Sequence, residues 1–190
     1  MIEALVLAAG LSSRTSRYKM TLPLGEKTVI EHTVDTLLEV CDNVIVVAGH
    51  KAQECEQALQ NRNGIKMIEN PYFREGMFSS VQCGVKELNY DTFFVLPGDQ
   101  PMIKRQTLTK LLETEGDIVN PSFKGKKGHP VLFRNDCREG ILEMPEDGIL
   151  RDFIHARNAN VIEVEDEGIL LDIDTDEDYD YIKQRFFEKG

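Results

Sequence analysis

The sequence predicts an α/β fold in which helices cover both faces of a mostly parallel sheet. Three observations lead to this prediction. Short apolar runs alternate along the chain with segments whose apolar residues recur every three or four positions, as in strand–helix–strand units. The first run, over residues 2–9, is almost entirely apolar, as expected for a strand buried on both faces. The first run ends at a glycine, after which the chain becomes small, polar and basic, as expected for a loop.

The elements of the first two thirds follow one another regularly. The first strand is predicted over residues 2–9, and Gly10 ends it. A helix is predicted to start at Thr28, because Thr28 and Glu31 form a capping-box pattern. The apolar residues after it share one helical face: Ile30, Val34, Leu37, Leu38 and Cys41. Further strands are predicted over residues 44–48, 65–68, 92–96 and 118–120, and further helices over residues 53–61, 79–88 and 104–115.

The pattern changes after Pro121. Residues 122–134 carry four basic side chains and no acidic one, and their glycines and proline predict a loop or hairpin leading into an extended segment at 131–133. A helix over 150–156, a strand over 161–164 and a last helix over 176–187 complete the chain. We expect one domain over 1–190, with a core over 1–120, a small inserted substrate lobe over 121–172 and a C-terminal return helix over 173–190.

The composition excludes several classes of protein. The 190 residues, 41% hydrophobic and 29% charged, are typical of one globular domain with a sizeable core. No apolar run approaches the roughly 20 residues of a transmembrane helix, and the N-terminus lacks the basic segment of a signal peptide. We therefore expect a cytoplasmic protein with no membrane partner. The net charge of −11 argues against nucleic-acid binding and requires any polyanion site to be a local basic island.

The loop after the first strand is such an island. Between Gly10 and Gly25 it carries Arg14, Arg17 and Lys19 and no acidic residue. Small residues let a backbone approach a ligand, and guanidinium and ammonium groups supply the charge that a polyphosphate demands. We interpret the segment as a loop that wraps the phosphates of a nucleoside triphosphate. The P-loop and dinucleotide fingerprints are both missing, which argues against a P-loop NTPase and an oxidoreductase. A basic surface loop remains the alternative.

The loop resembles the signature of nucleotidyltransferases that activate sugars, alcohols and pterins, and within them most closely the molybdenum cofactor cytidylyltransferase branch. The matching pattern is Leu7-Ala8-Ala9-Gly10-x-Ser12-x-Arg14-x-x-x-x-Lys19. The resemblance implies a three-layer α/β/α Rossmann-like fold with a nucleotide-binding core. It implies that Arg14 and Lys19 are catalytic and that the nucleotide is bound by Leu7, Ala8, Ala9, Gly10 and Ser12. Ala9, where the guanylyl relative has glycine, implies CTP. Thr15 and Ser16 depart from the Met-Gly that is usual after the arginine.

A second motif, Leu96-Pro97-Gly98-Asp99-Gln100-Pro101, ends a predicted strand in a tight turn. Mg²⁺ is held by one or two carboxylates together with substrate phosphates, and Asp99 across the sheet edge from a basic loop suits that role. An Asx-turn is the alternative. The resemblance implies that Asp99 is a catalytic residue and metal ligand, with Pro97 and Gly98 beside the nucleotide.

An acidic stretch precedes the last predicted helix. Residues 163–180 contain ten acids and no base. Those from 176 onward suit a helix N-terminus, with Thr175 or Asp174 as the cap. The resemblance implies Asp174 as the second metal ligand, with Asp172 as its rival. Asp176 stands where proline is usual in the resembled pattern.

Two further motifs are weaker. The first opens a predicted helix and consists of Gly76, Met77, Ser79 and Ser80. The resemblance implies that these residues lie beside the base and ribose of the nucleotide, and a plain serine N-cap is the alternative. The resembled pattern often has serine where Phe78 stands.

The other of these two weaker motifs lies in the basic segment after Pro121. The resemblance places Gly128, His129, Pro130 and Arg151 on the acceptor side, although a turn with solvated lysines is the alternative.

We therefore predict an Mg²⁺-dependent enzyme that transfers CMP from CTP to a phosphorylated acceptor and releases pyrophosphate. By resemblance the acceptor is molybdopterin, and a molybdoenzyme or its chaperone is a protein partner. A guanylyl transferase, a sugar- or polyol-phosphate transferase and a non-catalytic nucleotide-binding protein remain alternatives.

Overall fold

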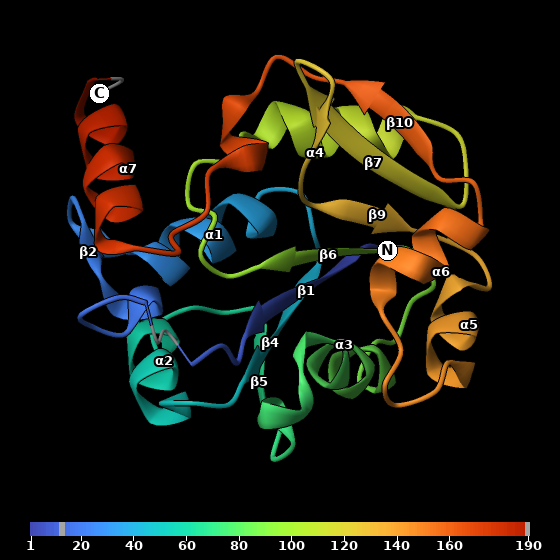
Figure 1. The fold of residues 1–190 in the computed structure, drawn as a ribbon, viewed down its shortest axis with the longest axis horizontal. Coiled ribbons are helices and arrows are strands. Elements are labelled where there is room, and N and C mark those ends of the chain that lie inside the picture. The colour runs from blue at the N-terminus through green and yellow to red at the C-terminus, as the bar shows by residue number, and fades with distance from the viewer. Residues whose placement is uncertain (12–13, 189–190) are drawn as a thin grey trace.

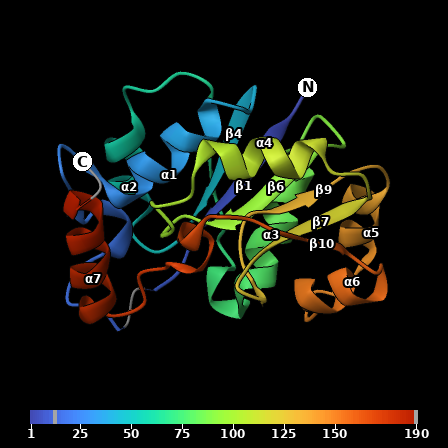
Figure 2. The same cartoon turned by 90° about the horizontal axis from the view of Figure 1, so that it is seen from above.

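The computed structural model describes residues 1–11 and 14–188 and confirms the predicted α/β fold. Across these residues a sheet of eight strands runs through the molecule, and helices cover both faces (Figure 1, Figure 2). The strand order is β10-β7-β9-β6-β1-β4-β5, with β8 paired to β7. The strands are β1 (Glu3–Ala8), β4 (Asn43–Ala48), β5 (Ile65–Glu69), β6 (Phe93–Pro97), β7 (Ile118–Phe123), β8 (Lys126–Lys127), β9 (Val131–Phe133) and β10 (Asn160–Glu163).

Most neighbouring strands of the sheet are parallel. Strand β1 lies between β4 and β6 and is parallel to both, whereas β9 runs antiparallel to β6 and β7. Because parallel strands end at the same edge, the loops after β1 and β6 emerge next to each other. Strands β8, β9 and β10 come from the predicted substrate lobe but belong to the same sheet as the core. The division into core and lobe stays a prediction.

The helices bury two separate apolar clusters on the two faces of the sheet. On one face lie α1 (Val29–Leu38), α2 (Ala52–Leu59) and α4 (Arg105–Glu113), and on the other α3 (Met77–Lys86), α5 (Cys137–Glu143) and α6 (Leu150–Ala156). Successive side chains of β1 point to opposite faces, so Val6 joins the first cluster and Leu7 the second. Each fully buried aliphatic side chain contributes roughly 1.5–3 kcal/mol, which explains why the central strands β1, β4 and β6 are mostly apolar.

A third apolar cluster docks the C-terminal helix α7 (Asp176–Glu188) beside the opening loop. Tyr179 and Ile182 of α7 pack against Leu22 and Leu24, which belong to the loop and to a small hairpin of β2 (Pro23–Leu24) and β3 (Lys27–Thr28). The Tyr179 hydroxyl donates a hydrogen bond to the Pro23 carbonyl. Helix α7 therefore lies next to the loop despite the distance between them in the sequence, as Figure 1 shows.

The structure corrects several boundaries. Helix α3 begins at Met77, two residues before the predicted start, and β7 extends beyond Asn120 to Phe123. Pro121 lies within β7, and its carbonyl accepts a hydrogen bond from the Gly128 N–H at 2.9 Å. The sequence also missed β2, β3, α5 and three short 3₁₀ helices, η1 (Lys19–Thr21), η2 (Phe73–Glu75) and η3 (Glu167–Leu170). These elements are too short to produce a clear periodic pattern. Among the described residues, no helix combines the length and the apolar character needed to cross a bilayer.

Candidate active site

The opening loop returns to the end of the strand that it leaves. Strand β1 ends at Ala8, and the buried hydroxyl of Tyr18 donates a hydrogen bond of 3.0 Å to the Ala8 carbonyl. Helix η1 then starts at Lys19. The hydrogen bond holds residue 18 of the loop against the end of β1, so Lys19 lies at the carboxyl edge of the sheet. Ser12 lies outside the described residues.

The turn that carries Asp99 lies against the same strand end. The Gly98 N–H donates to the Leu7 carbonyl at 2.9 Å, and its carbonyl accepts from the Thr33 hydroxyl at 3.0 Å. A Cβ on Gly98 would come within 2.7 Å of the Ile30 side chain, so glycine lets the turn approach α1. These contacts place Asp99 beside the opening loop.

Ion pairs join the two segments to a third, which precedes α7. The Lys19 ammonium lies 2.5 Å from an Asp99 carboxylate oxygen and 3.4 Å from one of Asp174. The Arg14 guanidinium lies 2.9 Å from the other Asp174 oxygen. The structure thus brings Arg14, Lys19, Asp99 and Asp174 together from three distant parts of the chain.

Burial perturbs the charges of this cluster. Asp99 is only 4% exposed, and burial raises its pKa above the ordinary aspartate value against the opposing charge of Lys19. For Lys19, burial alone lowers the pKa, but the nearby carboxylates of Asp99 and Asp174 raise it above its ordinary value. Perturbed titratable groups of this kind are common at functional sites.

The carboxylates of the cluster suit a hard divalent cation. Asp99, Asp172 and Asp174 each offer an oxygen, and the three oxygens lie within 4.8 Å of one another. Burial, followed by the charges of Asp99 and Asp174, raises the pKa of Asp172. The second Asp99 oxygen, Oδ1, is buried and has no hydrogen-bond partner within the described chain. An orphaned buried carboxylate oxygen in an all-oxygen donor set is what Mg²⁺ or Mn²⁺ would satisfy.

A second group of predicted residues opens α3. Gly76 precedes the helix with a φ of 117°, a conformation that favours glycine. The Ser79 hydroxyl donates to the Gly76 carbonyl at 2.8 Å, and the Asn70 side-chain amide donates to the hydroxyls of Ser79 and Ser80 at 2.9 and 3.0 Å. Both serine hydroxyls therefore shape the turn. No sequence motif marks Asn70, which directly follows β5.

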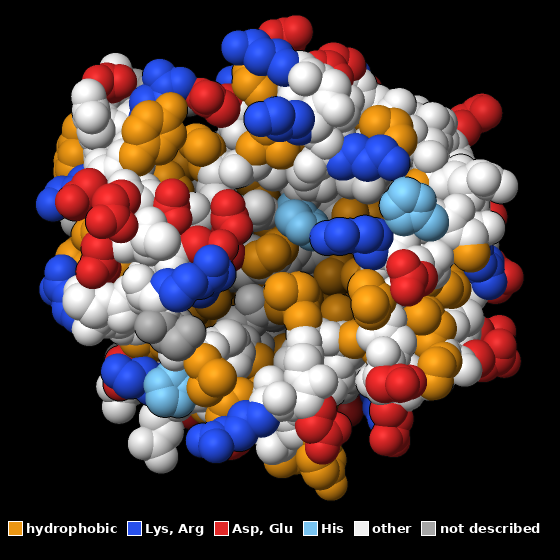
Figure 3. All heavy atoms as spheres, in the orientation of Figure 1, with side chains coloured by type: hydrophobic (Ala, Val, Ile, Leu, Met, Phe, Trp, Pro, Cys, Tyr) orange, Lys and Arg blue, Asp and Glu red, His pale blue; other side chains and the backbone are white. Residues whose placement is uncertain are grey.

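A cavity of about 800 Å³ lies between the start of α3, the segment before β9 and α6. Figure 3 shows this face hollowed near its centre, with hydrophobic side chains on the floor and basic, acidic and histidine side chains along the rim. Five of the predicted residues line the cavity: Gly76, Met77, Gly128, His129 and Arg151. The carboxylate cluster, Ser79, Ser80 and Pro130 do not line it.

The segment before β9 is held tightly against the protein. The Asn120 amide donates to the Gly128 carbonyl at 2.8 Å, and the His129 N–H donates to the Ile169 carbonyl at 3.0 Å. A Cβ on Gly128 would lie 2.2 Å from that Ile169 oxygen, so this position requires glycine. The peptide bond between His129 and Pro130 is cis.

His129 is a buried polar group on the cavity wall. Its Nδ1 has no hydrogen-bond partner among the described residues, and burial lowers its pKa to about 4. The lowered pKa keeps the imidazole neutral near pH 7. The exposed Arg151, which also lines the cavity, belongs to α6.

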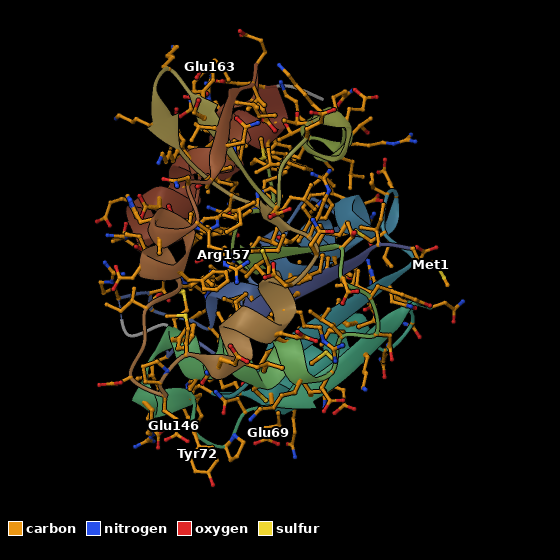
Figure 4. The ribbon with its side chains drawn as sticks, turned by 90° about the vertical axis from the view of Figure 1, so that its right-hand side faces the viewer. Met1, Glu69, Tyr72, Glu146, Arg157 and Glu163 are labelled. Atoms are coloured by element: carbon orange, nitrogen blue, oxygen red, sulfur yellow. The ribbon has the colours of Figure 1, made fainter. Side chains whose placement is uncertain are left out.

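An ion pair joins α5 and α6. Arg157 follows the end of α6 and pairs at 2.5 Å with Asp136, which precedes α5; Figure 4 labels Arg157.

Comparison with known proteins identifies the family of the chain. Residues 4–161 match the family model described as MobA-like NTP transferase domain. The chain is 30% identical over 189 residues to molybdenum cofactor cytidylyltransferase of Escherichia coli (strain K12), and the match covers 98% of each chain.

Solved structures show the same fold. A nucleotidyl transferase from Methanothermobacter thermautotroptrophicus superimposes with a TM-score of 0.88 at 27% identity, over 100% of this chain and 99% of the other. A Mycobacterium tuberculosis H37Rv protein in complex with manganese superimposes with a TM-score of 0.76 at 22% identity, over 96% and 97% of the two chains.

Proposed function

Because this chain belongs to the MobA-like NTP transferase family, we propose that it transfers CMP from CTP to a phosphorylated acceptor and releases pyrophosphate. The main support is the cluster in which Lys19 of the opening loop contacts Asp99 at 2.5 Å. Cations for a triphosphate and carboxylates for its metal ion thereby share one edge of the sheet. The similarity to the cytidylyltransferase of Escherichia coli supports CTP as the nucleotide and molybdopterin as the acceptor.

In this reaction an oxygen of the acceptor phosphate attacks the α-phosphorus of CTP. A new oxygen–phosphorus bond forms, and the bond from the α-phosphorus to its bridging oxygen breaks. Pyrophosphate leaves with the electron pair. A phosphate monoester is already anionic near neutral pH, because its second pKa is about 6. The enzyme therefore needs no general base, and catalysis consists of positioning and charge neutralisation.

Lys19 and Arg14 neutralise the charge that develops on the pyrophosphate. In the structure these side chains pair with Asp99 and Asp174. Binding of the triphosphate exchanges these carboxylates for phosphate oxygens. Asp99 and Asp174, with Asp172 as the alternative to Asp174, would then hold Mg²⁺, which polarises phosphate oxygens and offsets their charge.

We assign the acceptor to the cavity beside α6. Its floor is apolar and suits a flat heterocycle, while His129 and Arg151 offer a neutral hydrogen-bonding group and a positive charge on its wall. A sugar or polyol phosphate would use the charge but would leave the apolar floor without matching surface. A molybdoenzyme or its chaperone would receive the product, and a cytoplasmic location is consistent with such an exchange.

Pyrophosphate release tests the proposal directly. The protein is incubated with Mg²⁺, CTP or GTP, and molybdopterin or a sugar phosphate. We expect release with CTP and molybdopterin, and a loss of about 10²- to 10³-fold in kcat for Lys19→Ala and for Asp99→Asn. Lys27→Ala is the control, because Lys27 pairs with Asp35 outside the cluster.

Two results would contradict the assignment. Thermal stabilisation by nucleotides without pyrophosphate release would indicate a binding protein. Wild-type turnover by a folded Lys19→Ala or Asp99→Asn variant would remove that residue from the mechanism. The melting temperature of each variant must be measured, because loss of Lys19 leaves the buried Asp99 without a counter-charge.

A further inference from the structure

The opening loop and the segment before α7 lie side by side with matching spacing. Arg14 pairs with Asp174 at 2.9 Å. Two residues further along both segments, Ser16 donates to the Asp176 carboxylate, from its N–H at 3.2 and 3.3 Å and from its hydroxyl at 3.2 Å. Residues 14–16 therefore run in register with residues 174–176.

The α7 side of this pairing is held by a network of hydrogen bonds. The Asp178 carboxylate accepts hydrogen bonds from the backbone N–H groups of Asp174 and Thr175 at 3.2 and 2.8 Å, and from the Thr175 hydroxyl at 2.9 Å. The Thr175 hydroxyl in turn accepts from the Asp178 N–H at 3.1 Å. This reciprocal cap holds the start of α7, and buried Tyr179 anchors the helix to the protein.

The opposite side is an exposed loop of small and basic residues. Arg14, Ser16 and Arg17 are all exposed, and no helix or strand includes them. The sequence departs from the resembled nucleotidyltransferase pattern at Ser16 and at Asp176, and the structure shows that these two residues contact each other.

We propose that Asp176 is a positioning residue for the triphosphate loop, acting through Ser16. The contact between Ser16 and Asp176 holds the loop against the capped start of α7, so that Arg14 and Lys19 face the metal and phosphate positions before the nucleotide arrives. This inference rests on the proposed function, because it assigns the loop to the triphosphate. Neither Ser16 nor Asp176 touches the reacting atoms.

Loss of the contact leaves a loop that must be ordered when the nucleotide binds. The entropy lost on ordering the loop weakens nucleotide binding, because a smaller fraction of the molecules holds the loop in its binding-competent conformation. The geometry of the bound nucleotide stays the same. For Asp176→Ala we expect KM and Kd for CTP to rise about fivefold, the scale of one solvent-exposed hydrogen bond, with kcat nearly unchanged.

Matched variants separate positioning from helix capping. Glu177→Ala is the control, because Glu177 is exposed in the same first turn of α7 and its loss removes the same charge from the helix N-terminus. Ser16→Ala should weaken binding in the same direction, and the double variant should lose less than the sum of the two. Asp176→Asn, which keeps an acceptor oxygen, should recover part of the affinity. Additive effects, or equal effects of Asp176→Ala and Glu177→Ala, would overturn the proposal.

Limited trypsin digestion tests the contact without any assumption about activity. Cleavage after Arg14 and Arg17 is followed by mass spectrometry in the full-length protein. Asp176→Ala should be cleaved at these two sites several times faster than the wild type and Glu177→Ala. Unchanged cleavage would disprove the contact even if the enzyme turns over CTP. Faster cleavage in a protein that releases no pyrophosphate would retain the contact but disprove the proposed function.

Discussion

The pKa values and hydrogen bonds of single side chains in this molecule depend on neighbours from distant segments. Lys19 lies in a short 3₁₀ helix, yet the pKa of its ammonium group, which burial lowers, is raised by Asp99 and Asp174 from other parts of the chain. His129 shows the opposite case, because its surroundings give it no partner among the described residues. The sequence predicted both residues for the site, but the structure supplies the physical state of each.

Ala9 gives the first prediction at this scale. Ala9 is buried. A Cβ built on Gly49 would lie 3.0 Å from the Cβ of Ala9, so the space around this methyl group is tight. If its methyl group narrows the base pocket, Ala9→Gly should lower the ratio of kcat/KM for CTP to that for GTP by about tenfold. Ala48→Gly removes the same methyl from the end of β4 and is the control. An unchanged ratio in Ala9→Gly would disprove the role.

His129 gives a prediction about pH. Its pKa is about 4 in the folded protein and about 6.5 in a solvated chain. Between these values the unfolded state binds more protons, so the free energy of unfolding should fall as pH decreases from about 6.5 to about 4, by up to about 3 kcal/mol.

Urea unfolding at several pH values measures this slope. His129→Gln should flatten it, whereas His155→Gln, which changes an exposed histidine on α6, should leave it unchanged. The same slope in wild type and His129→Gln would show that other groups cause the acid sensitivity.

Among the elements, the contact between α3 and β1 depends on a missing side chain. A Cβ on Gly84 of α3 would lie 2.1 Å from Leu5 of β1 and 2.8 Å from Val47 of β4. Gly84→Ala should therefore push α3 away from the sheet and destabilise the protein by about 1–3 kcal/mol, measured by urea unfolding. Gly10→Ala is the control, because a Cβ at Gly10 meets no atom within 4 Å. Equal stability of both variants would show that α3 accommodates the methyl group.

Displacement of α3 should also affect the site. The start of α3 carries Gly76 and Met77 on the cavity wall, and Ser79 and Ser80 hold the preceding turn through Asn70. Gly84 itself lies away from the cavity lining, so a weaker acceptor affinity in Gly84→Ala would report the position of the helix.

At the scale of the whole molecule, three segments meet at one edge of the sheet. The opening loop, the Asp99 turn and the segment before α7 together form a cluster of cations and carboxylates on a protein whose net charge is −11. A metal ion with its nucleotide would bridge all three segments, so binding should stabilise the fold as a unit.

Thermal unfolding checks this expectation. CTP with Mg²⁺ or Mn²⁺ at about 100 times its Kd should add about 2.7 kcal/mol and raise Tm by roughly 5–10 °C. Asp99→Asn should lose the metal-dependent part of the rise. Asp91→Asn, the same exchange at the other end of β6, should retain it. A metal-dependent rise that persists in Asp99→Asn would place the ion elsewhere.

The sequence by itself determined the order of the main strands and helices, the family, and the two loops that emerge at the sheet edge. These follow from local periodicity, capping patterns and short motifs, whose information lies within a few residues. The capping box of Glu31 and the apolar face of α1 are examples, and the structure contains both.

Only the tertiary structure decided which distant groups touch. The pairing of Ser16 with Asp176 spans 160 residues, and the antiparallel insertion of β9 between β6 and β7 has no local signature. The cavity beside α6 and the unpartnered oxygen of Asp99 likewise arise from several elements at once. Such contacts depend on how the apolar faces pack together, and packing is a property of the whole chain.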